Sequence, residues 1–203
     1  MRVTPWGKIG GQPNDQRYRN FLREVARRYR GKVQTWEIEN EPNAGNHTPA
    51  DRIGDYVAVC KAVYEEIKAA DPDARIMGIS GTSKFQDFMN EVFKLGGAPY
   101  MDGVSWHTYT SPDTPDAVDL PAILKQSVDI VHQYKPGAPI WNSETGVYIV
   151  LRNEVDHAIP AQTVARKVRE RDVSFVQNGW MGAAFDEWQG GACIVSNAVY
   201  NFL

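Results

Sequence analysis

The chain has 203 residues, of which 42% are hydrophobic and 23% are charged, and this composition is typical of a globular protein rather than a disordered one. Its 22 Lys and Arg residues against 25 Asp and Glu residues give a formal net charge of −3, with both signs interspersed, so no nucleic-acid partner is expected. No run approaches the roughly 18 apolar residues of a membrane-spanning helix, so no membrane partner is expected either.

Strand and helix signals alternate along the chain. The first is a helix over 16–30 with Asn14 or Asp15 as its cap, and a strand over 33–39 follows. A second helix is predicted from a Thr48 cap to a break at Asp71, and then a strand over 75–80 and a helix through 85–93. The remaining elements are a strand over 103–109, a helix over 120–134, a strand over 139–144, helices over 161–178 and 196–203, and between these two a strand over 181–188. The first helix is expected to bury an apolar face of Phe21, Leu22, Val25, Ala26 and Tyr29.

This alternation predicts an α/β fold built from βαβ units with a parallel sheet. Each unit between Glu41 and Glu144 takes about 34 residues, so a complete (β/α)8 barrel of eight such units needs roughly 270 residues, which is more than the chain contains. We therefore expect a partial TIM barrel, strands four to eight with their helices, in which residues 1–203 form a single catalytic-domain fragment. The competing prediction is a doubly wound open sheet of five strands. The lack of a Gly-rich phosphate loop after any strand weakens it.

Two carboxylates follow the ends of different predicted strands, Glu41 in the run WEIENEPN and Glu144 in IWNSETG. The carboxyl ends of parallel barrel strands are the face at which barrel enzymes carry their active sites. A pair of carboxylates at that face suits hydrolysis of a glycosidic bond, because one can protonate the leaving oxygen while the other attacks the anomeric carbon. For either residue alone, a helix cap or a surface ion pair is the favoured explanation of the carboxylate.

The sequence motifs around the two carboxylates resemble those of the retaining glycoside hydrolases of clan A. Asn40-Glu41-Pro42 follows a strand that begins with Trp36, and Glu144 lies on a strand three units later. Within the clan, the run WEIENEPN and the later run SWHTY are most similar to family 39, which contains β-xylosidases and α-L-iduronidases. Other families of the clan share much of the pattern. The resemblance covers nearly the whole chain in element order.

The resemblance implies a double displacement in which Glu41 is the general acid/base and Glu144 is the nucleophile. It implies that Asn40 binds the sugar 2-hydroxyl and that His107 and Tyr109 lie under the sugar near the nucleophile. Trp188 resembles the aromatic platform on which the sugar stacks. For His107 and Tyr109, a buried hydrogen-bonded pair inside the barrel is a nearly equal interpretation. For Trp188, a tryptophan packed at the rim is the alternative. Glu37 is expected to be an internal ion partner, on the same side of its strand as Glu39 and Glu41.

No cofactor or metal is expected, because neither the two cysteines nor the four histidines have a metal-binding spacing. Cys60 is expected to be a buried free thiol. A non-catalytic carbohydrate-binding protein or an inactive barrel fragment is the alternative function, and a different barrel hydrolase or lyase a weaker one. The expected partner is a carbohydrate substrate. Open strand edges would also favour self-association or pairing with a missing N-terminal barrel half. The sequence leaves open whether the protein is secreted or cytoplasmic, since no signal-peptide pattern is present.

Overall fold

The computed structural model describes residues 1–3, 15–44, 48, 50–82, 84–110 and 120–147. The chain divides into two compact units, one of Met1–Trp106 with Ile130–Pro139 and the other of His107–Asp129 with Ile140–Leu203. The predicted elements over 161–178, 181–188 and 196–203 lie outside the described residues. That residues 1–203 form one catalytic domain stays a prediction.

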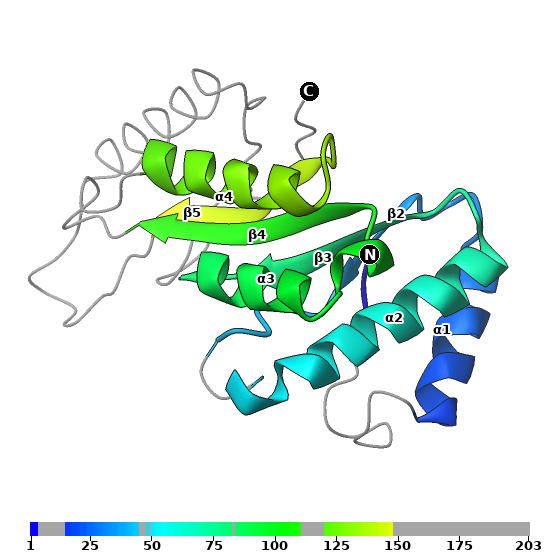
Figure 1. The fold of residues 1–203 in the computed structure, drawn as a ribbon. Helices are drawn as coiled ribbons and strands as arrows, with labels where there is room; N and C mark the ends of the chain where they lie inside the picture. Colours follow the sequence, from blue (N-terminus) through cyan, green and yellow to red (C-terminus); the bar gives the residue numbers. More distant parts are fainter. Residues whose placement is uncertain (4–14, 45–47, 49, 83, 111–119, 148–203) are drawn as a thin grey trace, which may run out of the picture. The chain divides into compact units, whose positions relative to one another are not determined.

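Five strands form a sheet whose strand order follows the chain: β1 (Arg2–Val3), β2 (Thr35–Ile38), β3 (Arg75–Gly81), β4 (Gly103–Thr110) and β5 (Ile140–Val147) (Figure 1). The pairs β1–β2, β2–β3 and β3–β4 are parallel. A doubly wound sheet reverses its strand order at a switch point, and this sheet does not reverse. The doubly wound alternative is therefore wrong. The fold is α/β with consecutive parallel strands, as in part of a (β/α)8 barrel.

The strand β1 was not predicted from the sequence, because two residues are too few to show a periodicity. It pairs with β2 in a register that sets Arg2 opposite Glu37. The backbone N–H of Glu37 donates to the carbonyl of Met1 at 2.7 Å, and that of Glu39 donates to the carbonyl of Val3 at 2.8 Å. A short piece of the strand before β2 is therefore present, and it brings a cation alongside the acidic run of β2.

The helices are α1 (Gln16–Arg28), α2 (Ile53–Ala70), α3 (Phe85–Lys94) and α4 (Leu120–Tyr134). Asp15 caps α1, since its Oδ1 accepts from the backbone N–H of Arg17 at 2.7 Å. The predicted Thr48 cap is wrong: a 3-10 turn over Ala50–Arg52 comes first, and α2 begins after it without a side-chain cap. Among the helices of the described ranges, none combines the length and the apolar character needed to cross a bilayer.

A buried layer between β2 and the helices α1 and α2 forms the core of the first unit. Its fully buried side chains are Tyr18, Leu22 and Ala26 of α1, Trp36 and Ile38 of β2, and Cys60, Val63 and Ile67 of α2. The predicted apolar face of α1 is thus partly wrong, because Phe21 is 41% exposed and Tyr29 is 36% exposed. The buried residues of α1 recur every four positions, so the buried stripe is centred on Tyr18 and leaves Phe21 at its margin.

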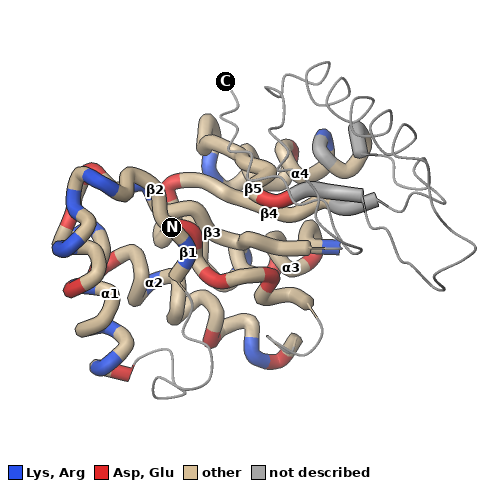
Figure 2. Tube along the Cα trace, turned by 180° about the vertical axis from the view of Figure 1, so that it is seen from behind, with Lys and Arg blue, Asp and Glu red and all other residues tan. Residues whose placement is uncertain are grey.

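Ion pairs join α1 to α2 at the margin of this layer. The Arg19 guanidinium lies 3.1 Å from Glu65 and 3.0 Å from Glu66, and Arg23 lies 2.6 Å from Glu66. Figure 2 shows basic and acidic residues along both helices. Burial alone would raise the pKa of Glu66. The hydrogen bonds and charges of the two arginines together lower it by more than burial raises it, so the pKa lies below its usual value. Glu66 therefore stays ionised although it is buried.

Candidate functional site

The chain leaves β2 through a strained turn that carries Glu41. β2 ends at Ile38, and the next residues include two with left-handed backbone, Glu39 with φ 64° and Glu41 with φ 47°. The backbone N–H of Glu41 donates to the carbonyl of Ser80, at the end of β3, at 2.9 Å. Non-glycine residues with positive φ are uncommon and concentrate at functional sites, where the surrounding structure holds them. The turn is therefore a candidate site on backbone geometry as well as on sequence.

Glu37 in β2 and Glu39 just after it have different surroundings in the structure. Glu37 forms the predicted ion pair, with Arg2 at 3.0 Å. Glu39 is only 7% exposed. Burial is the main cause that raises the pKa of Tyr18 and raises that of Cys60 to about 12, and the negative charge of Glu39 adds to both effects. Tyr18 and Cys60 belong to α1 and α2, so the charge of Glu39 acts on residues of both helices. That Glu39 shares a side with Glu37 and Glu41 stays a prediction.

Asn40 is held by a cation from the neighbouring strand. Its Oδ1 accepts a hydrogen bond from Nη1 of Arg2. The same guanidinium donates to Glu37 Oε2 through Nε at 3.2 Å and through Nη2 at 3.0 Å. Because a guanidinium only donates, its contact assigns the oxygen of the Asn40 amide to Arg2 and leaves the NH2 group as the donor for a ligand. Sequence reasoning missed Arg2, since nothing in the sequence marked its segment as a strand.

In the second unit, His107 of β4 lies beside Glu144 of β5. Nε2 of His107 is 3.8 Å from Oε2 of Glu144. The His107 side chain is fully buried, whereas 22% of the Glu144 side chain is exposed. The distance is that of an electrostatic contact rather than a hydrogen bond. A partly exposed carboxylate beside a buried imidazole can meet a ligand on one side while the protein holds it on the other.

A buried hydrogen bond fixes the two strands next to this pair. Nδ2 of Asn142 on β5 donates to Oγ1 of Thr108 on β4 at 3.0 Å. Asn142 and Thr108 are each one or two residues from the members of the pair, and both are buried. The bond therefore holds His107 and Glu144 in a defined register.

The predicted site residues are distributed over the two units. Asn40 and Glu41 lie in the first unit, and His107 and Glu144 lie in the second. The structure brings Asn40 together with Arg2, and His107 together with Glu144. Tyr109 belongs to β4, but its side chain lies outside the described part of the structure, and Trp188 lies outside the described residues.

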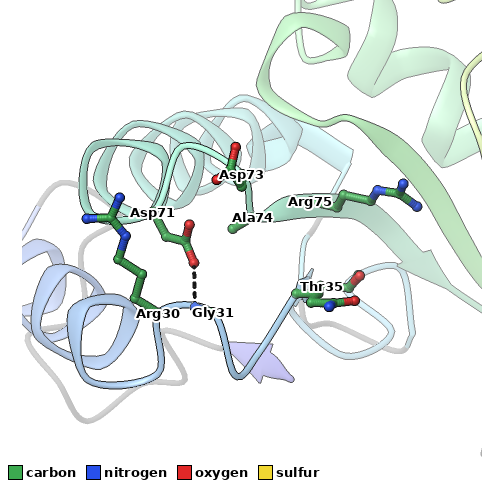
Figure 3. Close-up of a pocket in the computed structure, with 8 residues that line it drawn as sticks. Arg30, Gly31, Thr35, Asp71, Asp73, Ala74 and Arg75 are labelled. Carbon is green, nitrogen blue, oxygen red and sulfur yellow. Dashed lines mark hydrogen bonds between the residues drawn. The ribbon is translucent and has the colours of Figure 1, made fainter.

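A polar pocket of about 380 Å³ lies elsewhere in the first unit. Thr35 and Arg75, the first residues of β2 and β3, line it together with Gly31, whose N–H donates to Asp71 Oδ2 at 3.2 Å (Figure 3). Figure 3 shows the Arg30 and Arg75 side chains extending in different directions rather than converging. The pocket is at the amino ends of the strands, opposite the ends that carry barrel active sites, and it is not part of the candidate site.

No family model and no curated protein matches the chain. Solved structures do match it. A family 39 β-xylosidase from Caulobacter crescentus is 24% identical with a TM-score of 0.53, and the match covers 75% of this chain and 35% of that one. A family 39 glycoside hydrolase from Bacteroides cellulosilyticus WH2 is 23% identical with a TM-score of 0.57, over 78% of this chain and 34% of that one. Xylanase 10B from Thermotoga petrophila RKU-1, in complex with xylobiose, is 17% identical with a TM-score of 0.56, over 80% of this chain and 49% of that one.

These likenesses define the class of fold. The chain has the fold of part of the TIM barrel of glycoside hydrolases, and it spans about a third to a half of the length of the solved structures it matches. The resemblance to clan A glycosidases, with family 39 among them, is confirmed at the level of the fold.

Proposed function

We propose that this chain carries the two catalytic carboxylates of a retaining glycoside hydrolase that cleaves O-glycosidic bonds of oligo- or polysaccharides. Glu41 is the general acid/base and Glu144 is the nucleophile. The observation that carries the proposal is the contact between the buried His107 and the partly exposed Glu144, at 3.8 Å. The strained backbone at Glu41 and the barrel fold shared with known glycosidases support it further.

The proposed reaction is a double displacement. A carboxylate oxygen of Glu144 attacks the anomeric carbon while the bond to the leaving oxygen breaks, and Glu41 gives its proton to that oxygen. The ionised Glu41 then takes a proton from water, whose oxygen attacks the same carbon and displaces Glu144. Two inversions retain the configuration, and Glu41 is protonated again at the end.

Two neighbouring residues would assist this reaction. Asn40, whose oxygen accepts from Arg2, offers its NH2 group to the oxygen of the sugar 2-hydroxyl. Contacts at that hydroxyl strengthen in the transition state of glycosidases. His107 keeps Glu144 oriented from the buried side. Tyr109 and Trp188 are proposed to contact and stack on the sugar, as the family resemblance implies.

The solved structures suggest the first substrates to try. One is called a β-xylosidase, and another is a xylanase solved with xylobiose. We therefore propose substrates with β-xylosyl units, and we include aryl β-glucosides and α-L-arabinofuranosides in the same panel. Release of the aryl chromophore from each substrate measures turnover.

The wild-type chain and two variants test the proposed roles of Glu41 and Glu144. Glu144→Gln, which keeps the shape of the side chain but removes the nucleophile, should abolish turnover on every substrate. Glu41→Ala should lose turnover on glycosides with poor leaving groups yet retain part of it on dinitrophenyl glycosides, which need little protonation. Equal losses on both substrate types would contradict the roles. No turnover by the folded wild-type chain would favour a carbohydrate-binding role, which sugar titration would detect.

We also propose that the sheet is completed by a further polypeptide. β1 lies at the end of the strand order, and strands in that place offer backbone groups for pairing with another chain. The partner is either a second copy or a segment that supplies the preceding barrel strands. Sedimentation velocity over a range of concentrations distinguishes self-association from a monomer.

A further inference from the structure

We propose that Asn43 is a positioning residue that holds the turn carrying Glu41 in its strained conformation. The proposal rests on the acid/base role given above to Glu41. It concerns a residue whose side chain binds the backbone of the neighbouring turn, and it follows from how the turn after β2 is attached to the turn after β3.

The Asn43 side chain binds the backbone of a single residue in the neighbouring turn. Its Nδ2 donates to the carbonyl of Thr82, and its Oδ1 accepts from the backbone N–H of Thr82 at 2.9 Å. One amide side chain thus satisfies both backbone groups of Thr82, as a paired strand residue would. This pair of bonds is referred to below as the Asn43 clamp.

The clamp acts close to Glu41. Glu41 precedes Asn43 by two residues, and its own N–H donates to the carbonyl of Ser80, two residues before Thr82. Between Glu41 and Asn43 stands Pro42, whose ring fixes φ and removes freedom from the connection. Three hydrogen bonds therefore join the two turns over three residues on each side.

Both turns contain residues with left-handed backbone, a conformation that needs support from neighbouring contacts. Glu41 has φ 47°, and in the facing turn Ile79 has φ 75° and Ser80 has φ 44°. Left-handed conformations are unfavourable for these residue types and persist only when neighbouring contacts determine them. The bond from Glu41 to Ser80 joins two such residues directly, and the Asn43 clamp is the next attachment along the chain. Without the clamp, we expect the turns to separate and relax.

The Asn43 side chain also lies next to a packed part of the core at Gly81 and Phe85. A Cβ placed on Gly81 would lie 3.2 Å from Asn43 Oδ1 and 2.6 Å from Cβ of Phe85. Phe85 is buried and stacks on Trp106, with ring centroids 4.9 Å apart. The Asn43 amide oxygen therefore lies next to space that a side chain at position 81 would fill, beside the hydrophobic core.

Amide hydrogen exchange, followed by NMR on the labelled chain, tests the proposal without requiring activity. In Asn43→Ala, exchange at Thr82 should accelerate because its acceptor is lost. The deciding probe is the N–H of Glu41, which bonds to Ser80 and not to Asn43. We expect its exchange to accelerate by roughly tenfold, the effect of losing about two side-chain hydrogen bonds. Unchanged protection of the Glu41 N–H would overturn the proposal.

Two further variants keep the exchange result interpretable. Asn90→Ala removes a different tertiary hydrogen bond, the one that Tyr134 donates to Asn90 Oδ1 at 3.2 Å, and it should leave Glu41 unaffected. Asn43→Asp keeps the acceptor for Thr82 and loses the donor, so it should give an intermediate effect. Should Asn43→Ala not fold, the Glu41 exchange rate in Asn43→Asp decides in its place.

A kinetic measurement separates this proposal from the proposed function. In a chain that turns over glycosides, Asn43→Ala should reduce kcat at least tenfold more on alkyl glycosides than on dinitrophenyl glycosides, because only the former need the Glu41 proton. Equal reductions would mean that Asn43 only stabilises the fold, and would overturn the positioning role. Absence of turnover in the wild-type chain would count against the proposed function, while the exchange experiment would still decide whether Asn43 holds the turn.

Discussion

The imidazole of His107 is fully buried and lies 3.8 Å from a Glu144 carboxylate that is partly exposed. The pair joins adjacent strands β4 and β5, and the buried bond between Asn142 and Thr108 holds the same two strands together. The contact with His107 orients the Glu144 carboxylate before a ligand binds, while its exposed part stays accessible. Preorganisation of this kind is what a nucleophile requires, because misplacement of an attacking atom is costly in rate.

Replacing His107 by Ala should therefore reduce kcat/KM by roughly tenfold to a hundredfold, because a small misplacement of an attacking group costs up to about a hundredfold in rate. Aryl glycoside hydrolysis by the purified variant measures the loss. His132→Ala is the matched control, because His132 is exposed on α4. Equal activity of the two variants would contradict a role for His107 beside the proposed nucleophile, Glu144.

Arg2→Met should weaken recognition at the 2-hydroxyl, because the variant leaves Asn40 Oδ1 and Glu37 without their shared cation. Arg2→Lys should not restore function fully, since a single ammonium does not reproduce the geometry of the guanidinium fork. The measurement compares kcat/KM for a glycoside with that for its 2-deoxy analogue. We expect the preference for the 2-hydroxyl to shrink in Arg2→Met. Arg17→Met, at an exposed residue that pairs locally with Asp15, should leave the preference unchanged.

Gly81→Ala should destabilise the chain by about 1–3 kcal/mol, because the added Cβ would lie 2.6 Å from Cβ of Phe85 in a packed region. Gly54→Ala on α2 is the counterpart, since its added Cβ would meet nothing within 4 Å apart from its chain neighbours and the backbone of its own helix. It should stabilise the chain by up to about 1 kcal/mol through helix propensity. Urea unfolding followed by circular dichroism measures both. Equal urea midpoints for Gly81→Ala and Gly54→Ala would show that a Cβ at position 81 does not clash with Phe85 as the structure indicates.

Glu66→Gln should destabilise the chain by roughly 1–3 kcal/mol at neutral pH, because Arg19 and Arg23 lose a buried anionic partner. The pKa of Glu66 is lowered in the folded chain, so the contribution of its charge to stability is present above the ordinary glutamate pKa and disappears as the pH falls through the lowered value. The unfolding free energies of the wild type and of Glu66→Gln should therefore become equal as the pH falls.

The control for this pH dependence is Glu24→Gln, at an exposed pair with Arg27 on α1. Exposed pairs contribute little to stability. Its unfolding free energy should follow that of the wild type across the pH range. Constant separation between Glu66→Gln and wild type down to strongly acidic pH would show that the charge of Glu66 is not what stabilises the contact between α1 and α2.

The fold class could be predicted from the sequence because alternating strand and helix signals limit the topology strongly. The strands predicted over 75–80, 103–109 and 139–144 lie close to β3, β4 and β5, since each segment is a short run rich in apolar and strand-forming residues. What periodicity could not decide was the order of the strands. That order depends on which strands pair, and it removed the doubly wound alternative.

The local geometry of the candidate site was less accessible from the sequence. Arg2 lies on a strand too short to produce a pattern, so its bonds to Asn40 and Glu37 had no signal. The two-residue alternation of a strand does not extend through Glu39, because β2 ends at Ile38 and Glu39 takes positive φ, a conformation that the residue type does not predict. Strain of this kind depends on tertiary contacts, and it occurs where the chain has to aim a side chain rather than continue a ladder.

The order of the strands also bears on how the chain assembles. Each strand from β2 onward pairs with the strand that preceded it in the chain. A growing chain would therefore have a pairing surface ready for each new strand as it emerges, and no strand would wait for a partner made much later. Pairing each strand with its predecessor gives the smallest sequence separation that a parallel sheet allows, and smaller separations favour faster folding. The sheet could thus lengthen by one βα unit at a time during synthesis.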